Sequence, residues 1–337
     1  MRIARLVGPC LAVLLCLAVP NVASGGDPVE LFGASSDLGN GLFGTIDQTT
    51  GAFSQRGTTP TGQQMPALAC NAAQVLFGSE NRTVTAPMTA VGGGTRCSFL
   101  VRLDQSNGAV TQSFGFITLA GAPNSCLRIS DFDFNPANGV LYGVGRASAS
   151  RDALYTISLT TPPVATQVGL LDPTCTSNCL ARGGLAFRDD GALFVVSIRD
   201  QLARLNPADA SVIGSILPMN ECFDAASFRS SDDQLYAAAC DNGDLYTIDE
   251  TTGTVTPLLL DATEEMGALA FCGDRGGIIG GVTPTPTVPA ATATPTRTST
   301  PPVTGPVEVP TMSGLAMAIF GLMLGAVAVL SILRVRT

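Results

Sequence analysis

Short apolar runs recur through the central part of the chain, and each is followed by a cluster of Asp, Asn, Thr and Gly. The runs are rich in β-branched and aromatic residues and are bounded by turn-forming residues, a pattern typical of short strands. One phrase returns nearly unchanged: LFGTIDQTTGAF from Leu42, FLVRLDQSNGAVT from Phe99 and LYTIDETTGTVT from Leu245. This pattern predicts a protein built from a repeated unit of strands and turns.

Each repeated unit contains four candidate strands. One strand is marked by an apolar residue followed by an aromatic one, in LFG at Leu31, LFG at Leu76, LYG at Leu141, LFV at Leu193 and LYA at Leu235. Most units begin with a strand that ends in Phe, in ISDFDF up to Phe134, GGLAF up to Phe187, AASF up to Phe228 and GALAF up to Phe271. Later strands include LYTIS from Leu154 and GTVTPLLL from Gly253. Four short strands in about 45 residues are typical of one propeller blade.

The two ends of the repeat region complement each other. GALAF at the C-terminal end has the character of a first strand, whereas the region begins at Leu31 with later strands and lacks a first one. We therefore predict that both ends complete one blade, which hides the sheet edges. Residues 25–276 are expected to form an all-β propeller of about five four-stranded blades, with an insertion near residues 79–96. Six or seven blades, or a pair of immunoglobulin-like sandwiches, are the alternatives.

The recurring Asp and Gly of this phrase indicate a turn between two strands. Asp ends a strand and Gly follows four residues later, at Asp47–Gly51, Asp104–Gly108 and Asp249–Gly253. The Asp can accept backbone N–H bonds across the turn, and the Gly can adopt the positive φ that a Cβ resists. Calcium binding is the alternative, but each turn offers few acidic ligands, so we expect no cofactor. This LYxID…TG phrase resembles the repeats of exported bacterial β-propeller proteins, and the resemblance covers most of residues 25–276.

Composition restricts the possible chemistry. Histidine is absent and all 18 basic residues are Arg. The chain therefore lacks Ser-His-Asp triads, HExxH zinc sites, Schiff-base lysines and the P-loop lysine. The formal net charge is −9, whereas nucleic-acid binding needs a surface rich in positive charge. We expect no nucleic-acid partner, and we favour a protein that is not an enzyme.

The sequences at both ends of the chain are typical of targeting segments. Residues 1–24 have Arg2 and Arg5, an apolar stretch and a small-residue site ending at Ser24, as in a secretory signal peptide. A retained N-terminal membrane helix is the alternative. Residues 314–333 carry no charge and are long enough to span a bilayer. The arginines that follow predict that the body lies outside the cytoplasm, at the cell surface or anchored in the membrane.

A short motif precedes the predicted membrane helix. Residues 309–337 combine VPTMSG, the apolar stretch and the terminal arginines, and this tail resembles the IPTL-type and PEP-type sorting signals of bacteria. The resemblance implies a membrane protease as partner and assigns the processing motif to Val309, Pro310, Thr311 and Met312. The motif departs from the family at Val309 and Met312. PPVTG from Pro301 resembles a sortase motif less well, and a plain tail anchor is the remaining alternative.

Residues 277–308 form a Thr/Pro-rich linker. Proline at every second or third position excludes helices and sheet ladders and favours an extended chain. About thirty residues at ~3.1 Å each would extend roughly 90 Å. We expect a disordered stalk that holds the body away from the membrane.

The cysteines predict a disulfide framework. Of 10 cysteines, Cys10 and Cys16 lie in the predicted signal peptide, and an even number remains for an oxidising compartment. The repeat register favours the pairs Cys222–Cys240, Cys97–Cys126, Cys175–Cys179 and Cys70–Cys272. The last pair would link the closing blade to its neighbour. Zinc binding by the CTSNC segment is the alternative.

The most unusual residues of the repeat are Asp131 and Asp133. They alternate with Phe in SDFDF, where other units place Ala or Ser. A first strand lines the axis of a propeller, so the two carboxylates are weak candidates for a metal or substrate site, and a salt bridge with Arg is the simpler expectation. Two function classes remain. We favour a surface-displayed binding or scaffold module with an unknown extracellular ligand. The alternative is a polysaccharide hydrolase or lyase that uses the two carboxylates, ~7 Å apart along one strand.

Overall fold

The computed structural model describes residues 29–35, 41–59, 64–172, 180–240, 242–259 and 265–273. All regular structure in these residues is β-strand, as predicted. They contain no helix long and apolar enough to cross a membrane. The predicted signal peptide, linker and C-terminal membrane helix lie outside the described residues.

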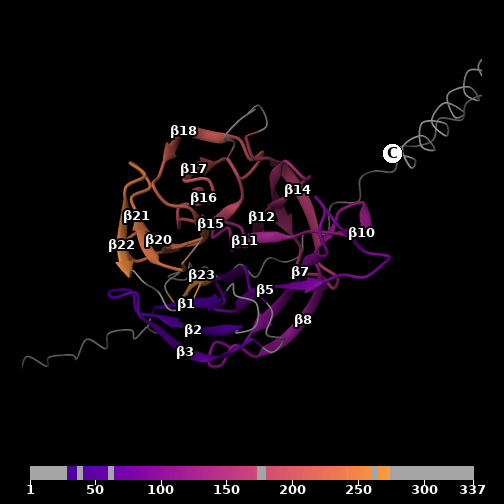
Figure 1. Ribbon diagram of the computed structural model, residues 1–337, viewed down its shortest axis with the longest axis horizontal. Coiled ribbons are helices and arrows are strands. Elements are labelled where there is room, and N and C mark those ends of the chain that lie inside the picture. The colour runs from indigo at the N-terminus through magenta and orange to yellow at the C-terminus, as the bar shows by residue number, and fades with distance from the viewer. Residues whose placement is uncertain are drawn as a thin grey trace, which may run out of the picture. The chain divides into compact units, whose positions relative to one another are not determined.

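The strands form five sheets, which follow one another in a ring (Figure 1). Sheet A contains β23 (Met266–Cys272), β1 (Glu30–Ser35), β2 (Leu42–Ile46) and β3 (Phe53–Thr58). Sheet B contains β4 (Ala67–Cys70), β5 (Leu76–Thr83), β7 (Arg96–Leu103) and β8 (Val110–Phe116). Sheet D contains β15 (Gly183–Phe187), β16 (Leu193–Ser197), β17 (Gln201–Leu205) and β18 (Val212–Pro218). Sheet E contains β19 (Phe223–Arg229), β20 (Gln234–Ala239), β21 (Leu245–Ile248) and β22 (Val255–Leu259).

Sheet C departs from the repeat. It begins with β11 (Ile129–Phe134), β12 (Leu141–Arg146), β13 (Asp152–Ile157) and β14 (Val164–Leu170). It continues with β9 (Thr118–Leu119), β10 (Ala122–Cys126) and β6 (Thr89–Ala90). The predicted four-stranded blade is thus present in four sheets, whereas the fifth is a 7-stranded sheet. The predicted insertion explains part of the difference, because β6 leaves the β5–β7 connection and joins the edge of sheet C.

The two ends of the repeat region share sheet A. β23 pairs antiparallel with β1, and Phe271 lies opposite Leu31 in the register. The predicted closure is therefore present. The pairing gives β1 a second strand neighbour and makes β23 the innermost strand of this sheet.

The five first strands surround the axis. Contacts run from β4 to β11, from β11 to β15, from β15 to β19, from β19 to β23 and from β23 back to β4. The approach is close: a Cβ on Gly184 would lie 2.5 Å from the backbone nitrogen of Ala226. Small residues therefore occupy most axial positions, and the centre of the ring is filled by backbone and small side chains.

Aromatic pairs join neighbouring sheets. In each pair, the aromatic residue of one second strand packs on the Phe at or next to the end of the first strand of the next sheet. The ring centroids are 5.3 Å apart in Phe77–Phe134, 5.2 Å in Tyr142–Phe187, 5.4 Å in Phe194–Phe228 and 5.1 Å in Tyr236–Phe271. Such pairs add about 0.5–1.5 kcal/mol beyond their buried area.

The interface between sheets A and B is built differently. Sheet B ends its first strand with Cys70 rather than Phe, and Cys70 forms a disulfide with Cys272 of β23. Phe32 packs in the same buried cluster as both cysteines. A covalent bond therefore takes the place of an aromatic pair between the closing sheet A and sheet B.

Candidate functional site

Asp131 and Asp133 bind backbone amides of neighbouring sheets. The Asp131 side chain, fully buried in β11, accepts hydrogen bonds from the amides of Leu185 in β15 at 2.8 Å and Ala226 in β19 at 3.2 Å. Its other oxygen accepts from the amide of Phe132 at 2.9 Å. Asp131 thus connects three sheets at the axis.

Asp133 repeats the arrangement one turn of the pleat further along β11. Its carboxylate accepts from the amides of Phe187 at 2.8 Å and Phe134 at 2.7 Å. In sheet E the equivalent residue, Ser227, accepts the amide of Phe271 through its hydroxyl at 3.1 Å. Asp131, Asp133 and Ser227 thus each accept a hydrogen bond from an amide of a neighbouring innermost strand.

The partners of Asp131 are these amides rather than the Arg that the sequence led us to expect. The described residues also contain no group of three or more Cys, Asp or Glu side chains that could hold a metal ion. Burial raises the pKa of Asp131 well above its ordinary value, whereas the three amides act in the opposite direction. Both oxygens of Asp131 are engaged, so a substrate has no access to them without opening the ring.

Two of the predicted disulfide pairs are present. Cys70–Cys272 closes a sequence separation of 202 residues, and Cys97–Cys126 closes one of 29 residues. The pair that the sequence favoured most, Cys222–Cys240, is not joined by a disulfide.

The strand register still makes Cys222 and Cys240 neighbours. The amide of Cys240 donates to the carbonyl of Cys222 at 3.1 Å, so the cross-strand proximity was predicted correctly although the bond was not. Cys175 and Cys179 lie outside the described residues. The processing residues Ser24, Val309, Pro310, Thr311 and Met312 also lie outside them.

The Asp turns have the predicted structure. Asp47 accepts the amides of Thr49 and Thr50, and Asp249 accepts those of Thr251 and Thr252. These amides lower the pKa of both carboxyls. The glycines that close the two turns have φ values of 72° and 73°. The carboxylates accept the backbone amides of the turn, as predicted.

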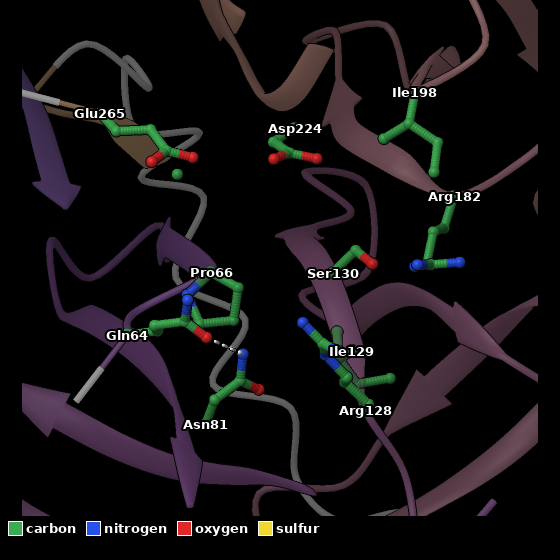
Figure 2. A pocket seen from close by; sticks show the side chains of 11 residues that line it. Gln64, Pro66, Asn81, Arg128, Ile129, Ser130, Arg182, Ile198, Asp224 and Glu265 are labelled. Atoms are coloured by element: carbon green, nitrogen blue, oxygen red, sulfur yellow. Dashed lines mark hydrogen bonds between the residues drawn. The ribbon is translucent and has the colours of Figure 1, made fainter. Parts of the chain in front are cut away.

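A cavity of about 150 Å³ opens at one end of the axis (Figure 2). The innermost strands all run in the same direction along the ring axis, so the residues at their starts meet at this mouth. The lining side chains at these starts are Pro66, Arg128, Arg182, Asp224 and Glu265, one from each sheet. The mouth therefore combines two arginines from neighbouring sheets with two carboxylates from the other side of the ring.

Figure 2 shows how these side chains are arranged. The carboxylates of Asp224 and Glu265 lie in the upper part of the view, and the side chains of Arg128 and Arg182 lie below them. Arg182 forms an ion pair with Asp152 at 3.4 Å. Burial, followed by the positive charges of Arg182, Arg146 and Arg96, lowers the pKa of Arg128, and Asp224 opposes that change.

The comparisons with known proteins identify a family. Residues 107–306 match a family described as "Repeat of unknown function (DUF6923)". The chain belongs to this family. The matched DUF6923 segment includes Asp131 and the four charged residues of the mouth. Gln64 and Asn81, which also line the cavity, lie before it.

Two solved structures are similar to this DUF6923 protein at low sequence identity. A nidogen/laminin complex has 12% identity and a TM-score of 0.45, over 72% of this chain and 98% of the other. A protein of unknown function from Bacteroides caccae has 16% identity and a TM-score of 0.43, over 73% of this chain and 99% of the other. A comparison with curated proteins finds no match.

Sequence reasoning did not find the mouth of this DUF6923 protein. Its candidate residues were the axial carboxylates, which are internal ligands of the backbone. A signal was present, because Arg128 and Arg182 each directly precede the first strand of their sheets, and Glu265 directly precedes β23. Charged residues at one repeated position indicate a common place in the ring.

Proposed function

We propose that this protein is an exported, non-enzymatic binding module whose body is presented outside the cytoplasm on a Thr/Pro-rich stalk. The export signal is supported by residues 1–24, and the stalk and membrane attachment by residues 277–308 and 309–337. A membrane protease that recognises Val309–Met312 is the proposed processing partner.

One observation carries the binding role. The mouth of the ring gathers charged side chains from four sheets around a single cavity. Charged side chains in this cavity do not contribute to stability through hydrophobic burial, and the two arginines repel each other. Placing them together favours recognition of a polar ligand.

The hydrolase or lyase alternative is less well supported. Glycoside hydrolysis needs one carboxyl group as an acid and a second as a base or nucleophile, and both must reach the substrate. Asp131 and Asp133 are 0% and 5% exposed, and their oxygens accept backbone amides. These two residues cannot supply that chemistry in the folded ring.

Ligand screening of the full-length protein tests the proposal. The pools should contain free amino acids, organic acids, mono- and oligosaccharides, and thermal-shift hits should be measured by calorimetry. Binding that is weakened at least tenfold by Arg128→Gln, without product formation, supports the binding role. Turnover of a polysaccharide, lost when Asp131 is replaced by Asn in a variant that still folds, would establish the enzymatic alternative instead.

Export and processing need a separate measurement. Fractionation of producing cells should place the body outside the cytoplasm, accessible to added protease. Replacement of Pro310 and Thr311 by Ala should abolish C-terminal cleavage. Finding residues 25–276 in the cytoplasmic fraction would overturn the proposed location.

A further inference from the structure

The cavity at the mouth contains a buried acceptor without a partner. Asn81 lies near the C-terminal end of β5, lines the cavity and is 1% exposed. Its Nδ2 lies 3.5 Å from the Oε1 of Gln64, and its Oδ1 has no hydrogen-bond partner among the described residues. A buried amide oxygen without a donor costs about 1–3 kcal/mol, so a ligand that donates to it would recover this free energy.

Arg128, on the same cavity, is a hydrogen-bond donor that can bind an anionic group. No ion pair of this side chain is found among the described residues, and it shares the lining of the cavity with Arg182. The positive charges of Arg182, Arg146 and Arg96 all act on it. A guanidinium binds a carboxylate through two parallel N–H bonds, a geometry that Lys does not offer. An anionic group at the mouth would also reduce the repulsion among the four arginines.

The acidic side of the mouth complements the basic side. Asp224 and Glu265 both line the cavity, and each also interacts with other groups of the protein. A carboxylate is therefore attracted to one side and a cation to the other. The volume of about 150 Å³ matches that of a cavity known to hold a single six-membered ring. A ligand of about that size fits the cavity.

We infer that the mouth binds a small zwitterion of the size of a free amino acid, with its carboxylate on Arg128 and its ammonium group toward Asn81, Asp224 and Glu265. The inference rests on the proposed binding function and specifies its ligand class. The Oδ1 of Asn81 supplies a directed acceptor for an ammonium proton. The charges of Asp224 and Glu265 supply the attraction that distinguishes a zwitterion from a simple anion.

Calorimetry of the full-length protein tests this assignment with matched probes. Each of the twenty free amino acids is compared with acetate and propionate, which lack the ammonium group, and with ethylamine, which lacks the carboxylate. We expect at least one amino acid to bind at least tenfold more tightly than any of these single-charge probes. Loss of one charge-assisted contact corresponds to that factor.

Variants locate the site. Arg128→Gln and Asn81→Ala should each weaken binding of that amino acid at least tenfold, and Arg128→Lys should retain more affinity than Arg128→Gln. Arg102→Gln is the matched control, since Arg102 is exposed and pairs with Phe77 at the opposite end of β5 from Asn81. This control should bind as the unaltered protein does. Circular dichroism of each variant verifies that loss of binding is not loss of fold.

The outcomes separate this inference from the proposed function. If an organic acid or a sugar binds, no amino acid does, and binding depends on Arg128, the binding function stands and the zwitterion assignment is wrong. Equal affinity for alanine and propionate would also refute the assignment. If no pool contains a ligand, both the assignment and the proposed function fail.

Discussion

Replacing Asp131 by Ala should destabilise the fold severely, because three backbone amides lose their acceptor at once. The amides belong to Phe132, Leu185 and Ala226, which lie in three different sheets. A buried N–H that loses its partner costs about 1–3 kcal/mol, so the expected loss in the free energy of unfolding is roughly 3–9 kcal/mol. Whole domains are stable by only about 5–15 kcal/mol, so this variant is expected to be close to unfolding.

Two milder variants give a graded comparison. Asp131→Asn can rotate its amide so that the remaining oxygen accepts from Leu185 and Ala226, which leaves only Phe132 opposite an NH₂ group. Ser227→Ala removes the acceptor of one amide, that of Phe271. Both should cost about 1–3 kcal/mol. Asp133→Ala, with two amides affected, should fall between Ser227→Ala and Asp131→Ala.

Urea unfolding followed by circular dichroism measures these differences at neutral pH. The stabilities should decrease with the number of amides left without an acceptor. A loss below about 1 kcal/mol for Asp131→Ala would refute the structural role. So would a rise in the melting temperature with calcium that disappears in this variant, because the carboxylate would then be a metal ligand.

Three further results are expected. Cys70→Ser removes the Cys70–Cys272 disulfide, which closes a sequence separation of 202 residues, and should lower the free energy of unfolding by about 3–5 kcal/mol in non-reducing urea titrations; an unchanged midpoint would contradict this. Gly108→Ala places a Cβ 2.7 Å from the ring of Phe43 at a φ of 73°. It should cost about 2–4 kcal/mol from overpacking and backbone strain in the same assay, and a cost near zero would show that the turn relaxes. Burial raises the pKa of Tyr155 from 10.0 to about 12. The unfolded chain therefore ionises first, and stability should fall by roughly 2–3 kcal/mol as the pH rises from about 10 to 12. Tyr155→Phe should reduce this dependence, and an equally steep profile in that variant would assign it to other groups.

The strand content and the closure of the ring were predictable because they depend on local patterns. Short apolar runs mark the strands, and the Asp-to-Gly turns mark where strands end. The missing first strand at Leu31 and the isolated one at Phe271 could be matched by comparing units. The same register placed Cys70 near Cys272 and Cys97 near Cys126, since equivalent positions of neighbouring units lie at one end of the ring.

The roles of the polar residues depended on the tertiary structure. The pattern shows that Asp131 faces the axis, but the groups it meets there, the amides of Leu185 and Ala226, come from sheets 54 and 95 residues further along the chain. The cavity at the mouth could not be predicted from the sequence either, because Asn81 and Arg128 come together only when the sheets close around one axis. Strand patterns report which face of a sheet a residue occupies, and only the closed ring determines which distant residue it meets.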